Sequence, residues 1–413
     1  MKTTLFSTLV VVTTGVLLTT ISCQNSTVTP APSTASELRV STSFANQTTQ
    51  FAFDVSKQVV AEEGQAKNVF ISPLSLHIAL GMIMNGANGQ TAQEIQKTLK
   101  LDAQTLAEAN QTYQNLLENL PGVDSEVTLT LANSVWYRNT FSVETSFQDL
   151  LKQSFKAEVS AQNFDDPATL DKINSWASQK TNGKIPKVLD QIQADNVMFL
   201  MNALYFKGDW KTQFKPEQTI DSPFKLASGN TTTVRMMRLN TALNHASRPN
   251  YTAFELPYGS DKFAMTVLLP AESTTADALI GNLTSTEWAQ LQQAMMSSTI
   301  DIGLPKFTLS YDINLNKALS SLGMPTAFTD GADFTKINKQ GGLTLSFVKQ
   351  NTFVAVDEKG TEAAAVTTGG ISLTSVPLPT LCDRPFIFVI HEKTSGTILF
   401  VGKIADPTKT TNS

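Results

Sequence analysis

The pattern of apolar and polar positions predicts helices mainly in the first half of the chain and strands mainly in the second. Ser72-Pro73 precedes an almost wholly apolar stretch at 74–84, which Asn85-Gly86 ends. This stretch predicts a helix buried on every side, with a serine N-cap and a proline in its first turn. Phe51, Val55 and Val59 also recur at helical spacing, and further helices are expected at residues 91–101, 106–117 and 166–181.

Several later segments are apolar along their whole length, which is typical of strands buried on both faces. The predicted strands cover residues 127–137, 196–206, 263–269, 345–356, 385–391 and 398–402. The last two flank Thr394-Ser395-Gly396, a turn composition that predicts a hairpin. Helices followed by strands, with no second linker between them, predict one large α+β domain on a mainly antiparallel central sheet.

The first 22 residues have the composition of a secretory signal peptide. Lys2 is the only charge before Glu37, and a largely apolar stretch follows it. Cys23 stands where a bacterial lipoprotein carries its lipid, so we expect either a lipid anchor there or cleavage and simple secretion. Residues 23–40 are rich in Thr, Ser and Pro and predict a tether before a domain at 41–408 and a tail at 409–413. We therefore expect an extracytoplasmic protein that meets a membrane only through this lipid.

Composition and charge argue against several classes of function. Of the 413 residues, 41% are hydrophobic and 16% charged, and the net charge is −5. This composition supplies a sizeable core, and the lack of a basic cluster argues against nucleic acid as a partner. Three histidines and two cysteines leave little material for a metal centre. We therefore expect no metal and no cofactor.

The three histidines do not form a recognisable catalytic motif. We place His77 inside the buried helix, His245 in a polar loop and His391 at the end of a strand. No Gly-x-Ser-x-Gly elbow, zinc-binding histidine pair or phosphate loop occurs in the sequence. The chain is therefore expected not to be an enzyme.

Residues 358–377 form a long segment of small side chains with no predicted element of its own. Loops of this length in a compact domain are usually functional, although a solvated linker has a similar composition. Every second residue is small or apolar and none is charged: Thr361, Ala363, Ala365, Thr367, Gly369 and Ile371. Glu362 falls on the opposite face. This alternation predicts a segment that is exposed at first and can later insert into a sheet as a strand.

A series of short motifs runs in a fixed order through the chain, at 68–75, 86–91, 202–210, 255–258, 304–307, 332–334, 356–365 and 383–386. The most distinctive is Asn202-Ala-Leu-Tyr-Phe-Lys-Gly-Asp-Trp210, with Phe214 beyond it. With these motifs the chain from about residue 40 to Pro407 resembles the serpins, the family of serine protease inhibitors. The resemblance implies the serpin fold, with helices around a large central sheet and an exposed reactive-centre loop at about 358–380.

In serpins this loop is a bait whose cleaved end inserts into the central sheet before the acyl-enzyme is hydrolysed. The family's spacing implies a reactive bond between Thr374 and Ser375, or a cut one residue earlier, after Leu373. Ile371, Ser372 and Leu373 would then contact the protease subsites. A small residue at the cut suits elastase-like or subtilisin-like serine proteases, and a leucine suits chymotrypsin-like ones. Papain-like cysteine proteases are a further alternative.

The resemblance also implies roles for residues outside the bait. The hinge, which matches inhibitory members better than carriers, comprises Glu358, Gly360, Thr361, Glu362, Ala363, Ala364 and Ala365. The group that controls sheet opening, called the shutter, and the tryptophan over the entry point comprise Ser72, Ser75, Asn174, Asn202, Trp210 and Gln350. Gln350 departs from the family, where histidine is common. We expect a monomer that forms a covalent complex with its target serine protease without a polyanion cofactor; a non-inhibitory binding protein is the alternative.

Overall fold

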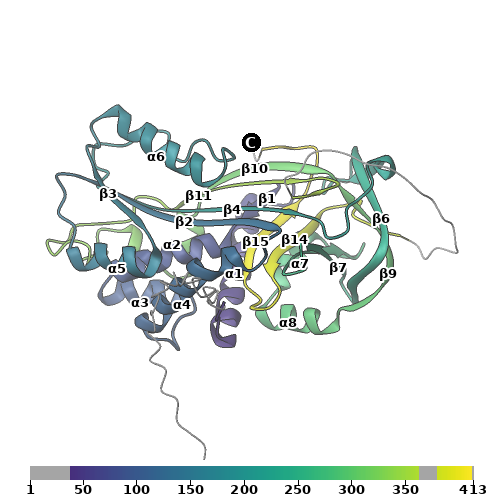
Figure 1. The fold of residues 1–413 in the computed structure, drawn as a ribbon, viewed down its shortest axis with the longest axis horizontal. Helices are drawn as coiled ribbons and strands as arrows, with labels where there is room; N and C mark the ends of the chain where they lie inside the picture. The colour runs from purple at the N-terminus through teal and green to yellow at the C-terminus, as the bar shows by residue number, and fades with distance from the viewer. Residues whose placement is uncertain (1–37, 362–378, 412–413) are drawn as a thin grey trace, which may run out of the picture. The chain divides into compact units, whose positions relative to one another are not determined.

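A computed structural model describes residues 38–361 and 379–411 of the chain. These described residues group into one compact unit. In Figure 1 a sheet crosses the middle of this unit, with α6 (Pro167–Lys180) on one side and α2 (Pro73–Gly86) among the helices on the other. No helix within the described ranges is both long and apolar enough to span a membrane.

The other elements of the described part complete two sheets and their helical cover. The remaining helices are α1 (Thr42–Glu63), α3 (Gly89–Thr98), α4 (Leu106–Asn119), α5 (Thr145–Phe155), α7 (Ala276–Asn282), α8 (Ser285–Ala294) and α9 (Asn316–Leu322). The strands are β1 (Val69–Ile71), β2 (Val127–Arg138), β3 (Glu158–Gln162), β4 (Met198–Asp209), β5 (Ile220–Lys225), β6 (Thr231–Arg248), β7 (Tyr251–Tyr258), β8 (Phe263–Pro270), β9 (Met296–Pro305), β10 (Phe307–Asn314), β11 (Lys349–Val356), β12 (Gly360–Thr361), β13 (Thr380–Leu381), β14 (Phe386–Glu392) and β15 (Ile398–Ile404).

The central sheet has the order β10-β11-β12-β4-β2-β3. A second sheet has the order β1-β15-β14-β8-β7-β6-β9-β13, with β5 paired to β6. Strand neighbours are antiparallel except at β2–β3 and β9–β13. The predicted fold class, α+β with a large and mainly antiparallel central sheet, is confirmed.

Local sequence explains the two helices that flank the central sheet. Ser72 caps α2 by accepting a hydrogen bond from the Ser75 amide, and nearly every residue of α2 is buried. Asp166 caps α6 in the same way, and Pro167 follows in its first turn. Asn182 and Gly183 then take positive φ values of 52° and 78°, which ends the helix. Both predicted helices are confirmed.

Other expectations from the sequence were wrong in detail. His245 lies in β6 and pairs with Phe254 of β7, so it is not in a loop. Strand β11 begins at Lys349, because residues 345–348 have no ladder partner among the described strands. Helices and strands also alternate more than expected, since β2 and β3 precede α6 and α7 to α9 follow β8. The hairpin of β14 and β15 was predicted correctly.

The central sheet separates two apolar cores. The larger lies mostly against α1, α2 and the second sheet. The smaller lies beneath α6 and contains Trp136, Phe164, Ile173, Trp176, Ala177, Leu189, Phe199 and Ala203. A sheet packed on both faces explains why the sequence of β4 is apolar throughout.

Candidate functional site

The candidate site is the gap between β4 and β11 in the central sheet. The short strand β12 occupies one end of this gap, where Thr361 pairs with Gly208 of β4 and Val356 of β11. We call this the closed end. Beyond Thr361 no backbone pairing joins β4 to β11 in the described part of the chain. We call that stretch, between residues 198–204 and 349–352, the open end.

Gly360 is required at the closed end by the close approach of β4. A Cβ atom at this position would collide with the carbonyl oxygen of Gly208 and the Cα atom of Asp209. Only glycine therefore lets the chain enter between the two strands at this point. The tight turn before it is held by Asp357, whose carboxylate accepts a hydrogen bond from the Lys359 amide at 2.9 Å.

Aromatic side chains cover the closed end. Trp210 is 3% exposed and stacks on Tyr258, with ring centroids 4.5 Å apart. Its indole N–H donates to the carbonyl oxygen of Asp357 at 2.9 Å. Tyr258 in turn shares a 2.6 Å hydrogen bond with the Thr361 hydroxyl. Burial raises the pKa of Tyr258 far above its usual value, so the phenol stays neutral beside the buried strand.

A buried carboxylate ties the closed end to neighbouring strands. Glu358 accepts hydrogen bonds from Thr219 at 2.8 Å and from the Lys306 ammonium at 2.6 Å. Partial burial opposes ionisation, but the hydrogen bonds from Lys306 and Thr219 outweigh it and lower the pKa of Glu358. The first hinge residue is thus held as an anion in a fixed position.

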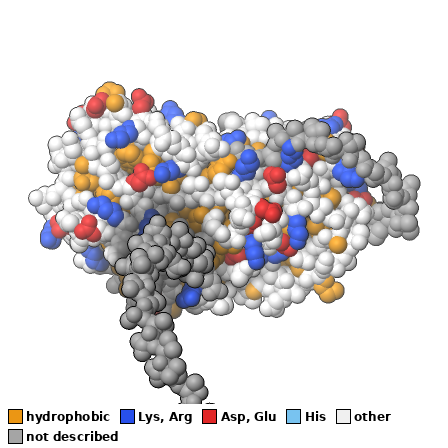
Figure 2. All heavy atoms as spheres, in the orientation of Figure 1, with side chains coloured by type: hydrophobic (Ala, Val, Ile, Leu, Met, Phe, Trp, Pro, Cys, Tyr) orange, Lys and Arg blue, Asp and Glu red, His pale blue; other side chains and the backbone are white. Residues whose placement is uncertain are grey.

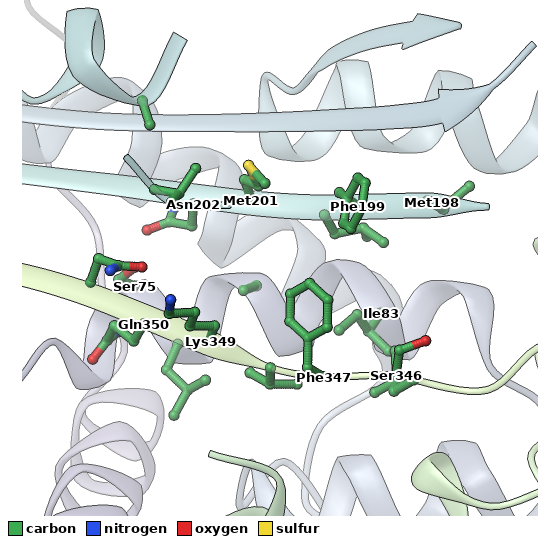
Figure 3. A pocket seen from close by; sticks show the side chains of 18 of the residues that line it. Ser75, Ile83, Met198, Phe199, Met201, Asn202, Ser346, Phe347, Lys349 and Gln350 are labelled. Atoms are coloured by element: carbon green, nitrogen blue, oxygen red, sulfur yellow. The ribbon is translucent and has the colours of Figure 1, made fainter. Parts of the chain in front are cut away.

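At the open end the strands border a cavity of about 390 Å³. Its walls come from α2, β4, α6 with the loop after it, and residues 342–352. Figure 3 shows Asn202, Ser75, Gln350 and Lys349 toward one end, and Met198, Phe199, Phe347 and Ile83 toward the other. The cavity is therefore polar near the middle of the gap and apolar farther from β12.

The predicted shutter residues Ser72, Ser75 and Gln350 lie together beside this cavity. The Gln350 amide accepts from the Ser72 amide at 2.8 Å and donates to the Ser72 carbonyl at 2.9 Å. The Ser72 hydroxyl donates to the carbonyl oxygen of Leu399. These bonds fasten β11 to the start of α2, and both the oxygen and the nitrogen of the Gln350 side chain are hydrogen-bonded.

Asn202 lies across the gap from Gln350, and only one end of its amide is satisfied. Its N–H group donates to the Asn133 side chain at 2.6 Å, and Asn133 donates to the carbonyl oxygen of Phe155. This chain of bonds fixes the orientation of the amide. The Asn202 Oδ1 atom is buried and has no partner among the described residues. A buried acceptor of this kind costs about 1–3 kcal/mol until a donor reaches it.

Asn174 does not join this group. Its side chain accepts from the amides of Val188 and Leu189 and donates to the Leu189 carbonyl, all within 3.0 Å. It therefore holds the loop after α6 against the helix, and Val188 of that loop lines the cavity. The structure places Asn174 in the cover of the gap and not among the residues between its strands.

Several predicted site residues lie outside the described residues. These are Cys23, Glu362, Ala363, Ala364, Ala365, Ile371, Ser372, Leu373, Thr374 and Ser375. Of the hinge, Glu358, Gly360 and Thr361 are described, and all three lie at the closed end with Trp210.

Sequence reasoning missed four residues that complete the site: Asn133, Thr219, Tyr258 and Lys306. Tyr258 and Lys306 belong to motifs recognised in the sequence, at 255–258 and 304–307. Nothing in their spacing indicates that they reach Thr361 and Glu358, more than fifty residues away. Only the fold brings these side chains together.

The histidines are far from forming a catalytic arrangement. His77 is buried, and its ring nitrogens contact the Tyr113 hydroxyl and the Leu99 carbonyl. His391 is buried between Thr266 and Glu255.

Within residues 38–361 and 379–411, no group of three or more His, Cys, Asp or Glu side chains could hold a metal ion. On the face in Figure 2, basic and acidic side chains are interspersed.

Comparisons with known proteins agree with this geometry. The family described as "Serpin (serine protease inhibitor)" matches residues 46–407. A leukocyte elastase inhibitor of Xenopus laevis is 33% identical and covers 87% of this chain and 98% of its own. The thermophilic serpin tengpin in its native state has a TM-score of 0.82 at 31% identity, over 90% of this chain and 96% of its own.

A structure of human thyroxine-binding globulin is also similar, with a TM-score of 0.80 at 27% identity, over 89% of this chain and 100% of that one. The relatives therefore include proteins named as inhibitors and one named for binding thyroxine. The match over most of its length shows that this chain belongs to the serpin family of protease inhibitors.

Proposed function

We propose that the protein is an inhibitory serpin, a suicide-substrate inhibitor of extracytoplasmic serine proteases. The observation that carries the proposal is β12, which occupies only one end of a gap that continues between β4 and β11. Insertion of a cleaved loop requires a chain that already lies at the start of the gap and an unpaired gap beyond it. Strand β12 and the open end provide these two features.

The register of β12 supports this proposal. Extending the antiparallel pairing by two residues sets position 363 opposite Val354 and Phe206, which are 1% and 6% exposed. Paired residues share a face, so positions 361, 363, 365, 367, 369 and 371 would all face α2. None of the residues at these six positions is charged.

The same register sets Thr367 opposite Asn202 and Gln350. A threonine hydroxyl there would bring a donor to the unpartnered Asn202 Oδ1 atom. Insertion would then satisfy a buried acceptor and fill the cavity at once. Both changes favour the inserted state over the state described here.

The reaction would begin as ordinary proteolysis. The serine oxygen of the protease attacks the carbonyl carbon of Thr374, forms an ester with it and releases the amine of Ser375. Insertion of the loop would then carry the bound protease away before water cleaves the ester. Similarity to a leukocyte elastase inhibitor supports an elastase-like target, with subtilisin-like enzymes next and chymotrypsin-like enzymes if the cut follows Leu373.

The test is to mix the protein with pancreatic elastase or subtilisin and separate the products on a denaturing gel. A band that survives heating, at the sum of the masses of protease and cleaved inhibitor, is expected. Mass spectrometry of the released C-terminal peptide then locates the cut. Complete cleavage without a complex for every serine protease tried would overturn the proposal.

A matched pair of variants tests insertion itself. Ala363→Arg would place a charge against Val354 and Phe206 and should convert the inhibitor into a substrate. Ala364→Arg would point to the opposite face, toward Tyr205 and the partly buried Phe353, and should keep more of its complex than Ala363→Arg. Thr361→Arg, beside Tyr258, should fail like Ala363→Arg. Equal complex formation by all three variants would contradict the register.

The alternative is a non-inhibitory binding protein, as thyroxine-binding globulin is named. Thermal unfolding before and after nicking the loop separates the two. A large rise in melting temperature after the nick supports insertion, whereas no rise supports a passive carrier.

We further propose an extracytoplasmic location with a lipid on Cys23, because the sequence before it has the pattern of a signal peptide. Intact mass after detergent extraction of the cell envelope tests this directly. A mature chain that begins beyond residue 23 without a lipid would remove the anchor and leave simple secretion.

A further inference from the structure

The cavity at the open end has the size and lining of a small-molecule site. Its volume, about 390 Å³, falls within the roughly 300–1,000 Å³ of ligand pockets. Aromatic groups dominate one end, where the ring centroids of Phe199 and Phe347 are 6.0 Å apart (Figure 3). Such a wall suits a flat aromatic body, since ring edges and faces pack well against one.

The polar end presents hydrogen-bonding groups that the protein leaves unused. Ser75 is 6% exposed and lines the cavity, and its hydroxyl makes no hydrogen bond to any described residue. The neighbouring Asn202 Oδ1 atom is buried and also unpartnered. The Gln350 amide, by contrast, already donates to and accepts from the Ser72 backbone. A ligand at this end must therefore offer a donor to Asn202, and it can donate to or accept from Ser75.

The charges around the cavity favour an uncharged ligand. Lys349 lies at its edge, but the carboxylates of Asp190 and Asp312 each approach its ammonium group at 3.8 Å. Asp195 also lines the cavity. An anion would lose its hydration beside these carboxylates. It would also gain little from Lys349, because Asp190 and Asp312 already approach that ammonium group. A cation would lose its hydration on reaching the end of the cavity that Phe199 and Phe347 line.

We propose that the cavity is a binding site for a small, uncharged aromatic alcohol, with its ring beside Phe199 and Phe347 and its hydroxyl between Ser75 and Asn202. The ligand would occupy the space between β4 and β11. Its effect on inhibition rests on the proposed function: an occupied cavity blocks insertion, so a protease would cleave the loop without being trapped.

Binding is tested on the full-length protein by calorimetry at neutral pH, with 2-naphthol as the probe. The comparison compounds are 2-methylnaphthalene, which lacks the hydroxyl, and 2-naphthoate, which carries a charge. We expect saturable one-to-one binding of 2-naphthol, roughly tenfold tighter than that of either comparison compound. Absence of saturable 2-naphthol binding, or equal affinity for all three, would overturn the proposal.

Two variants locate the site. Ser75→Ala keeps the cap of α2, which uses the Ser75 amide, and should remove most of the preference for 2-naphthol over 2-methylnaphthalene. Ala79→Leu fills the cavity from α2 and should abolish binding of both. Unchanged binding by Ala79→Leu would place the ligand elsewhere and refute the site. These measurements need no protease, so failure to trap elastase would refute the proposed function and leave the binding result standing.

Discussion

The two ends of the gap between β4 and β11 are built in opposite ways. At the closed end the chain is paired on both sides, the indole of Trp210 is bonded, and Glu358 has two donors. At the open end a cavity separates the strands, and both Asn202 Oδ1 and Trp176 Nε1 are buried without a partner among the described residues. The polar groups named at the closed end have hydrogen-bond partners, whereas these two at the open end do not.

This difference gives the gap a direction. A chain that advances from the closed end gains backbone pairing, fills volume and brings donors and acceptors to groups that lack them. In the native arrangement the closed end is hydrogen-bonded, whereas the open end lacks backbone pairing and contains a cavity. A state of this kind can be metastable and persist because a barrier separates it from a more stable one. Substitutions at the two ends should therefore change stability with opposite signs.

Removing the aromatic cover should have the largest effect. Trp210→Ala deletes a buried ring that stacks on Tyr258 and bonds Asp357, and should lower the free energy of unfolding by about 3–5 kcal/mol. Trp210→Phe keeps an aromatic contact but loses the N–H donor and part of the buried ring volume, so it should cost less, about 1–3 kcal/mol. Urea unfolding followed by circular dichroism measures both. Equal costs for the two variants would mean that stacking contributes nothing to the closed end.

The ion pair at the closed end comes next. Glu358→Gln removes the charge that faces Lys306 and should destabilise the protein by about 1–3 kcal/mol, because a buried group loses its charge-assisted bond. Glu272→Gln makes the same change at an exposed position and should alter stability by less than about 0.5 kcal/mol. Differential scanning calorimetry compares them, and a matching shift in both variants would argue against a structural role for Glu358.

The sequence was sufficient for much of the fold. The apolar run of β4 is a local pattern that indicates a doubly buried strand. The small residues at alternate positions from Thr361 are also a local pattern, and the inserting strand that they indicate stays a prediction. Ser72 and Asp166 mark helix starts by cap chemistry alone. These signals need no knowledge of distant residues.

The parts that could not be predicted depend on contacts across the fold. Thr219 and Lys306 reach Glu358 from other strands, and Asn174 turns toward the loop after α6. The strand β10 was not predicted, although its sequence has the pattern of a half-buried strand. Its apolar residues alternate with polar ones: Phe307, Leu309, Tyr311 and Ile313.

Filling the open end should stabilise the protein where changes at the closed end destabilise it. Ala79→Leu adds apolar atoms inside the cavity and should raise the free energy of unfolding by about 1–2 kcal/mol. By obstructing the gap it should also lower the fraction of protease trapped. Ala107→Leu, on the exposed side of α4, adds the same atoms without filling a cavity and should do neither. Destabilisation by Ala79→Leu would mean that this end of the gap is already tightly packed.

Acid should weaken the closed end, and this effect is the smallest of the four. Hydrogen bonds from Lys306 and Thr219 hold the folded-state pKa of Glu358 below its unfolded value, even though burial opposes them. The stability that this carboxylate contributes is therefore complete above the unfolded pKa and is lost as pH falls through the folded one. Because Lys306 is partly exposed, the change should be less than about 1 kcal/mol. Melting curves of the wild type and Glu358→Gln should differ by a constant amount from pH 8 to about pH 5. The difference should then narrow by that amount toward pH 3, and a difference that stays constant or widens in acid would show that another group controls the closed end.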